Sequence, residues 1–450
     1  MQKCFRSDMD IAIALSLAFL LLLAAVQQGI FILYPLMVSL GLLTAVYRHR
    51  GMPWSQLLRL MGQGIKQSTG VISILLLIGM VVASWLIAGT VPTLVYYGIK
   101  MLHPRWFLLG AFGLTGGISV LLGTSFGAAG TIGLALMIVA RGAGVDEAWA
   151  AGAIMAGAYV GDRCSPLSSS AHLVAAVTTT DIYQNLRHMV VTSWGALLVS
   201  SLIYGGVSWW HPVPLADRSL LQTIPAEFSI QPLTLLPAAV VVGLTLMRWP
   251  VKRTLFISLA CGIAIALTLQ ARSVPTVIST LLLGLHLPEA SGLKTLFQGG
   301  GLWGMAKVCS VVVVSTAFSG LLSGGGAFQS LGQRLSNWPG QRGLFGGTIV
   351  ASILTSAFGC SQTLAILLTH KIMQPIYQTA DASAEQLAVD MENSAVVIAP
   401  LIPWNIASFG PASILLMDGT FIPYALYLYI LPLWNWGWRS PLPQPCPKQP

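Results

Sequence analysis

Residues 70–90 read GVISILLLIGMVVASWLIAGT and contain no charged side chain. A run of about 20 apolar residues is long enough for a helix to cross a bilayer. The rest of the chain is similar, since only 8% of its 450 residues are charged and 55% are hydrophobic; soluble proteins carry about 25% charged residues. The sequence therefore predicts an all-α, polytopic membrane protein with about 10–13 transmembrane helices in the lipid bilayer.

Further apolar runs recur along the chain. With the first one they cover residues 11–28, 30–47, 70–90, 106–122, 126–141, 147–161, 189–209, 232–248, 254–271, 304–322, 344–369, 394–416 and 420–437. A weaker stretch at 274–287 is expected to dip into the membrane without crossing it. The run from Ile11 has no small-residue cleavage site and is followed at once by another, so we interpret it as a transmembrane helix rather than a cleaved signal.

An internal echo divides the chain. SVLLGTSFGAAGT at 119–131 resembles SILTSAFGCSQT at 352–363 when Phe126 is aligned with Phe358, and a Pro-Leu pair follows in each half, at 166–167 and 400–401. Paired interruptions of this kind indicate inverted repeats around a transport site, with probable re-entrant hairpins; chance similarity of apolar sequence is the alternative. We expect N-terminal helices and an amphipathic linker at 1–69, a first transport repeat at 70–210, a linker with intervening helices at 211–290, a second transport repeat at 291–437 and a Pro-rich tail at 438–450.

The net charge of +9 is spread over short groups between apolar runs. Nucleic-acid binding requires a basic patch or stripe, so no nucleic-acid partner is expected. Basic residues instead set topology: Lys3 and Arg6 precede the first span, and Arg48 and Arg50 follow the second. If these two spans form a hairpin, the positive-inside rule places the N-terminus on the cytoplasmic side of the cell (inner) membrane.

The sequence also limits the chemistry. Six cysteines lack the CxxC spacing of a zinc site, and they do not form a disulfide framework. No G-x-x-x-x-G-K-[ST] segment is present to bind nucleotide phosphate, so transport must draw on a gradient, and no cofactor is expected.

The first candidate constellation is GDRCSPLSSSAH at 161–172. Asp162 is an intramembrane carboxylate, which by its cost marks a functional site; the alternative is an interfacial pair with Arg163, which is as readily explained by snorkelling. Hydroxyl oxygens near a carboxylate suit a small cation. The candidate ligands here are Ser165, Ser168 and Ser169. His172 titrates near neutral pH in its unperturbed state, although a lone histidine is more often structural.

The second constellation is Glu392-Asn393-Ser394, followed by Pro400, Pro403 and Asn405. Glu392 is the second candidate carboxylate for a transported cation or proton, with helix capping as the alternative. Asn393 and Asn405 are candidate ligands. So are Thr131, Gln362 and Thr363, which belong to the echoed segments, although single hydroxyls in membrane helices commonly bond helix to helix.

A G-x-S-x-G segment at 123–127 places Ser125 in a nucleophile-like pattern. That motif requires a preceding strand and a catalytic triad. The flanking sequence here is membrane helix, so an intramembrane hydrolase is the less favoured alternative and no enzyme activity is expected.

Several segments together resemble the NhaC family of sodium–proton antiporters. These are GDRCSPLS at 161–168, LRHM at 186–189, the apolar segment at 75–104 and MENSAVVIAPLIPWN at 391–405, in the family's order, within a similarity over about residues 20–435. The resemblance implies sodium–proton antiport; a branch of the family exchanges malate with protons for lactate with sodium. It also implies the ion-transporter superfamily fold, with inverted repeats, re-entrant hairpins, an elevator-like transport domain and often a homodimer.

The chain departs from that family at acidic positions. Ser169 stands where the family has Asp, Ser170-Ala171-His172 where it has T-T-N, and Asn393 where it has the Asp of a Glu-Asp pair. Each half has lost one carboxylate, which weakens the expectation of sodium coupling. The alternative function is therefore a proton- or sodium-coupled carrier of a small organic acid or amino acid, with His172 as a substitute titrating group.

Overall fold

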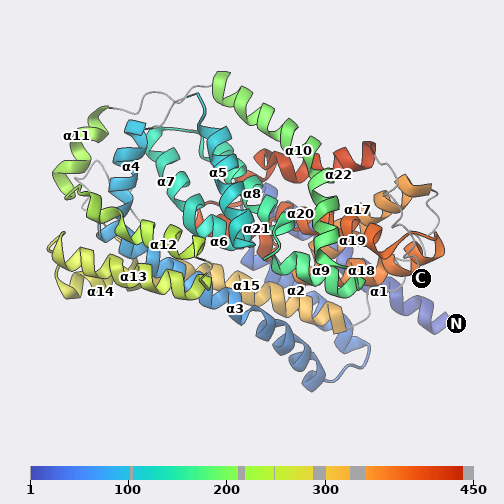
Figure 1. Ribbon diagram of the computed structural model, residues 1–450. Helices are drawn as coiled ribbons and strands as arrows, with labels where there is room; N and C mark the ends of the chain where they lie inside the picture. The colour runs from blue at the N-terminus through green and yellow to red at the C-terminus, as the bar shows by residue number, and fades with distance from the viewer. Residues whose placement is uncertain are drawn as a thin grey trace.

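The computed structural model describes residues 2–101, 105–210, 218–247, 249–286, 300–324 and 340–438. Its regular elements in these ranges are helices (Figure 1). The first half contains α1 Gln2–Gln27, α2 Leu33–His49, α3 Trp54–Ile87, α4 Thr90–Met101, α5 Phe107–Leu122, α6 Ser125–Ala128, the π-helix η1 Ala129–Gly133, α7 Leu134–Ala143, α8 Glu147–Cys164, α9 Ser169–Thr178 and α10 Ile182–Trp210.

The remaining elements follow in the same order. They are α11 Arg218–Glu227, η2 Pro232–Leu235, α12 Leu236–Leu246, α13 Val251–Thr268, α14 Val274–Leu283, α15 Gly301–Gly324, α17 Gly340–Gly359, α18 Gln362–Thr379, α19 Ala384–Glu392, α20 Ala395–Ile398, η3 Ala399–Leu401, α21 Ile406–Ile414, η4 Gly419–Tyr424 and α22 Leu426–Gly437. The expected tail lies outside the described residues from 439 onward.

Several helical segments are long and apolar enough to span a membrane. Four are found in the described residues, at Ser68–Ile87, Ser125–Ala143, Ile182–Trp210 and Gly301–Leu322, and the pair Ala384–Leu401 and Ile406–Ile414, bent by 58°, makes a fifth. Other predicted runs form shorter or interrupted helices, as at 344–369, where α17 gives way to α18. The protein is therefore a polytopic helical membrane protein, and the count of 10–13 crossings stays a prediction.

Small residues bring the central helices together. A Cβ atom on Gly64 of α3 would lie 2.0 Å from the Thr316 carbonyl oxygen of α15, and one on Gly161 of α8 would lie 1.9 Å from the Ser119 carbonyl carbon of α5. Close approach through small residues is a common means of packing membrane helices. These two pairs, α3–α15 and α5–α8, form the framework of the molecule (Figure 1).

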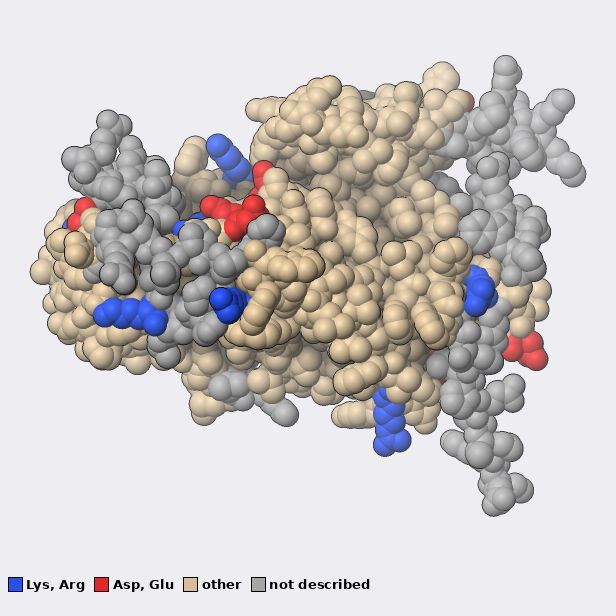
Figure 2. Space-filling model, turned by 90° about the horizontal axis from the view of Figure 1, so that it is seen from above, with Lys and Arg blue, Asp and Glu red and all other residues tan. Residues whose placement is uncertain are grey.

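The outer surface suits lipid. Large apolar side chains of α10 point outward, with Val191 76%, Trp194 70% and Leu202 65% exposed. Figure 2 shows a face with a broad uncharged area and only scattered acidic and basic groups. Such a surface is stable against hydrocarbon and costly against water.

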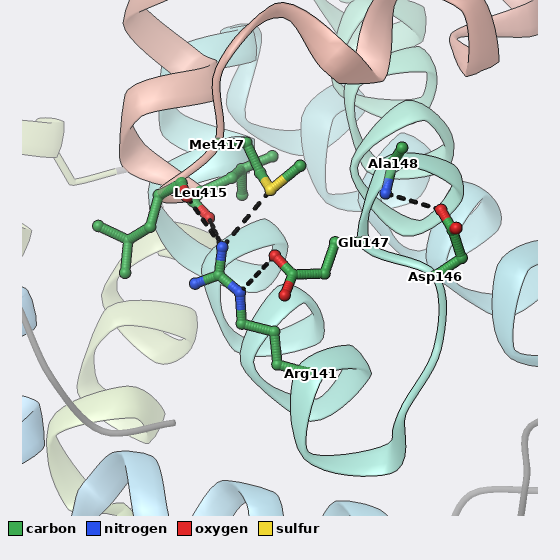
Figure 3. A network of polar contacts seen from close by, with 7 residues as sticks. Arg141, Asp146, Glu147, Ala148, Leu415 and Met417 are labelled. Atoms are coloured by element: carbon green, nitrogen blue, oxygen red, sulfur yellow. Dashed lines mark hydrogen bonds and ion pairs between the residues drawn. The ribbon is translucent and has the colours of Figure 1, made fainter. Parts of the chain in front are cut away.

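One surface ion pair ties distant segments together (Figure 3). Arg141, at the end of α7, contacts Glu147 of α8 at 2.9 Å and donates to the Leu416 carbonyl oxygen, also at 2.9 Å, just after α21. It is the one ion pair within 4 Å that the described part of the chain contains. The α7–α8 turn is thereby held to the end of α21.

Candidate functional site

Two helix breaks interrupt the first constellation. After α5, Gly123 takes a left-handed conformation with φ 68°, and Thr124 occupies the N-cap of α6. After α8, Ser165 is extended, and Ser168 caps α9 by accepting from the Ala171 N–H. These breaks bring backbone polar groups to the interior, which is tolerated at membrane depth only where protein or a water-filled cavity satisfies them.

The second constellation has the same breaks. Cys360, with φ 52°, follows α17, and Ser361 is the N-cap residue of α18. Ile402 is extended, and Asn405 caps α21 by accepting from the Ala407 N–H. Each of these four positions lies 237 residues after its counterpart in the first set, so the two regions share one succession of helix ends and helix starts.

This register corrects the one drawn from sequence. Phe126 lies in the first turn of α6, after a break, whereas Phe358 lies in the last turn of α17, before one. The two residues are 232 positions apart, five fewer than the structural spacing, and Pro166 corresponds to Pro403 rather than to Pro400. The alignment was wrong because similar apolar letters recur by chance, whereas caps and left-handed residues fix where helices end.

Asp162 lies where the two regions meet. It is 4% exposed, in the last turn of α8. One carboxylate oxygen accepts from the Ser125 N–H of α6 at 3.4 Å, and the other accepts from the Gln362 amide of α18 at 2.9 Å. Gln362 also donates to the Val396 carbonyl oxygen at 3.1 Å. The elements α6, α8, α20 and α21 lie in the centre of the molecule (Figure 1).

The serines after Asp162 have different positions. Ser168 and Ser170 both donate to the Asp162 carbonyl oxygen, Ser170 at 2.6 Å, and both are buried. Ser165 is buried and accepts from the Leu167 N–H at 3.1 Å. Ser169 is exposed, so the inward hydroxyl is that of Ser170, which the sequence did not single out.

His172 lies at the break between α8 and α9. Its ring nitrogen Nε2 is 2.9 Å from the Pro166 carbonyl oxygen, and the side chain is exposed. In this position it satisfies the break. The contacts do not place it beside either carboxylate.

Arg163 does not snorkel; it is fully buried. Its guanidinium donates to Asn393 Oδ1, to Ser193 Oγ and to Thr192 Oγ1, the last at 2.9 Å. One cation thus joins α8 and α10 to the turn after α19. Asn393, which replaces a family carboxylate, serves as a neutral partner of Arg163.

Glu392 is the most unusual group in the region. It is 1% exposed at the end of α19, and neither carboxylate oxygen has a hydrogen-bond partner in the described residues. An ionised carboxylate without partners is very costly to bury. Glu392 is therefore stabilised by holding either a proton or a cation.

The other predicted ligands are less informative. Asn405 is satisfied within the frame, since its amide also donates to the Ser356 carbonyl oxygen at 2.8 Å. Thr131 bonds back to the Gly127 carbonyl oxygen of its own helix at 2.7 Å. Thr363 is exposed in the first turn of α18. No group of three or more His, Cys, Asp or Glu side chains suited to a metal ion occurs in the described residues.

Two further findings concern residues with other readings in the sequence. Asp390 is buried and accepts from the Tyr377 hydroxyl at 2.7 Å, a third intramembrane acid that the burial criterion could have found two residues before Glu392. Ser125 follows the helix α5 rather than a strand, and its backbone N–H contacts Asp162. The strand-turn-helix context of a nucleophile elbow is therefore absent here.

Comparison with known proteins identifies this arrangement. Residues 157–438, which contain both sets of breaks from α8 onward, match the model of the Na+/H+ antiporter family. The chain belongs to the Na+/H+ antiporter family. It is therefore a membrane antiporter rather than an enzyme, and the resemblance to NhaC is confirmed.

Its relatives differ in what their names say they carry. The Na+/H+ antiporter NhaC of Alkalihalophilus pseudofirmus is 29% identical over 88% of this chain and 87% of its own. A malate-2H+/Na+-lactate antiporter of Bacillus subtilis is 27% identical over 88% and 85%. The arginine/ornithine antiporter ArcD of Halobacterium salinarum is 25% identical over 83% and 79%.

Proposed function

We propose that this protein exchanges sodium for protons across the cell membrane, with Asp162 and Glu392 holding the cation or the proton. The observation that carries the proposal is the position of Asp162, a buried carboxylate that accepts from Ser125 of one broken region and Gln362 of the other. A group with one contact in each region is placed to sense their relative movement.

The broken helices supply the remaining ligands. Helix C-terminal ends and unwound carbonyls coordinate cations in transporters with interrupted helices. The ends of α5, α8 and α17 all lie at such breaks. A sodium ion bound between these carbonyls and a carboxylate competes with a proton for the same negative charge, which couples the two fluxes.

The common spacing of 237 residues supports two repeats of inverted topology, with re-entrant hairpins at the breaks. The first repeat lies within residues 70–210 and the second within 291–437. In this mechanism one domain carries the site between the two faces of the membrane while the other remains fixed.

The position of Asn393 favours sodium over an organic substrate. Because its side chain accepts from the buried Arg163 guanidinium, the carboxylate missing at 393 is a lost partner for Arg163 rather than a lost ion ligand. The organic-substrate relatives keep the second function, a carrier of a small organic acid or amino acid, as the alternative that the experiment must separate.

Proteoliposomes that enclose a pH dye distinguish these functions. External sodium, with choline as the matched control, is expected to make the lumen alkaline as protons leave. The absence of a response to sodium and lithium, together with uptake of labelled malate, lactate or arginine, would establish the organic carrier and refute sodium–proton exchange.

A further inference from the structure

A second site lies away from the carboxylates, on the outer side of α2, α3 and α15 (Figure 1). An open groove of about 740 Å³ is lined by Met37, Gly41 and Arg48 of α2, Trp54 of α3 and Val314 of α15. Its walls are mainly apolar, apart from Arg48 and the neighbouring His49 at one end. No acidic side chain is found among the described residues that line it.

The groove has the length of one leaflet. Met37 and Arg48 are eleven residues apart on α2, which is roughly 16 Å along a helix. Half the hydrocarbon thickness of a bilayer is about 15 Å. An apolar channel of this length that ends in basic side chains matches the acyl chains and phosphate of a phospholipid.

Unmatched positive charge supports an anionic occupant. Two guanidinium nitrogens of Arg50, Nε and Nη2, are buried and have no hydrogen-bond partner in the described residues. This arginine follows Arg48 and His49 at the same end of α2. Basic pockets between membrane helices on the cytoplasmic side bind anionic lipid headgroups.

Gly41 provides an independent observation. It lies inside α2, where glycine weakens a helix relative to alanine. A Cβ atom built on it would meet nothing within 4 Å, so close packing of the protein does not require glycine here. A smooth glycine surface facing the groove leaves room for an acyl chain.

We infer that this groove binds an anionic phospholipid, with its acyl chains along α2 and its phosphate at Arg48 and His49. The lipid fills a surface between α2 and the framework pair α3–α15. This site is separate from Asp162 and Glu392 and does not depend on which substrate the protein transports.

Native mass spectrometry of the full-length protein tests the inference. Phosphatidylglycerol is expected to bind more tightly than phosphatidylcholine with identical acyl chains. Arg48→Gln should weaken phosphatidylglycerol binding about fivefold, the effect of one basic residue near an anionic headgroup. Arg59→Gln removes an exposed arginine of α3 outside the groove and should leave binding unchanged.

A second pair of variants tests the groove itself. Gly41→Leu fills the open space and should displace both lipids, whereas Gly206→Leu fills equally open space on α10 and should displace neither. Equal affinity for the two lipids, or unchanged binding in Gly41→Leu, would overturn the inference. So would a Gly41→Leu protein that keeps its lipid but loses a dimer, because the occupant would then be a second copy of the chain.

Discussion

The two broken regions share a frame but not their charges. Gly123, Thr124, Ser165 and Ser168 each have a counterpart 237 residues later that ends or starts a helix. The acids do not follow this spacing: the position that corresponds to Asp162 is Ala399, and the one that corresponds to Glu392 is Met155.

The difference lies in one additional interruption. In the first region α8 is continuous from Glu147 to Cys164, whereas the matching stretch of the second region stops at Glu392 and resumes as α20 after Ser394. This turn presents Glu392 and Asn393 to the interior. The repeated frame thus supplies the places where helices open, and unrepeated residues supply the chemistry.

The largest expected effect is the loss of exchange when either acid is neutralised. Asp162→Asn and Glu392→Gln should each reduce sodium-driven proton flux in proteoliposomes to background, because each removes a charge for which cation and proton compete. Asp146→Asn is the matched control, since it removes an exposed carboxylate from the start of α8 and leaves an equally good N-cap. Wild-type flux in either acid variant would refute the role of that residue.

The two arginines that join distant helices should differ strongly in their effect on stability. Arg163→Gln removes a buried cation that bonds α10 and the Asn393 turn, at an expected cost of about 3 kcal/mol or more. Arg141→Gln removes a partly exposed pair with Glu147, at an expected cost of less than about 1 kcal/mol. Thermal unfolding in detergent compares them, and equal shifts would contradict the difference that burial makes.

Asn393→Asp asks what the missing carboxylate would do. A charged acceptor for Arg163 makes a hydrogen bond roughly twice as strong as a neutral one. We expect a higher midpoint of thermal unfolding with sodium–proton exchange retained. A lower midpoint, or a change in the transported ion, would instead place residue 393 among the ion ligands.

The smallest expected effect concerns the first break in each region. The Thr124 side chain accepts from the Gly127 N–H, at 3.5 Å, whereas the Ser361 side chain makes no cap hydrogen bond. Thr124→Ala should therefore cost about 0.5–1 kcal/mol, at the low end for a lost N-cap, and Ser361→Ala less. The reverse order in thermal unfolding would show that Ser361 bears the larger load.

The scarcity of charge was sufficient to predict a helical membrane protein, because so few polar side chains cannot cover a water-facing surface. Pro166 and Pro403 marked two of the breaks. The break at Cys360 carried no such signal, since a left-handed conformation at a residue other than glycine is unusual, and the register of the repeat was consequently misplaced.

The candidate site was predictable only in its carboxylates. Asp162 and Glu392 were identified by their position in apolar sequence, and both are buried. The contacts of Arg163 with Thr192 and Asn393 depend on helices that are distant in the chain, so sequence spacing did not reveal them. For the same reason Ser169 and His172 were predicted at the site although both are exposed.

Competition between sodium and protons for Asp162 and Glu392 is the central claim, and proton release on sodium binding tests it most directly. Sodium chloride is added to weakly buffered, purified protein in detergent with a pH indicator, and choline chloride is the control. We expect sodium to release protons from the wild type, and fewer protons from Asp162→Asn and Glu392→Gln. Sodium binding without proton release, or undiminished release in both variants, would contradict the claim.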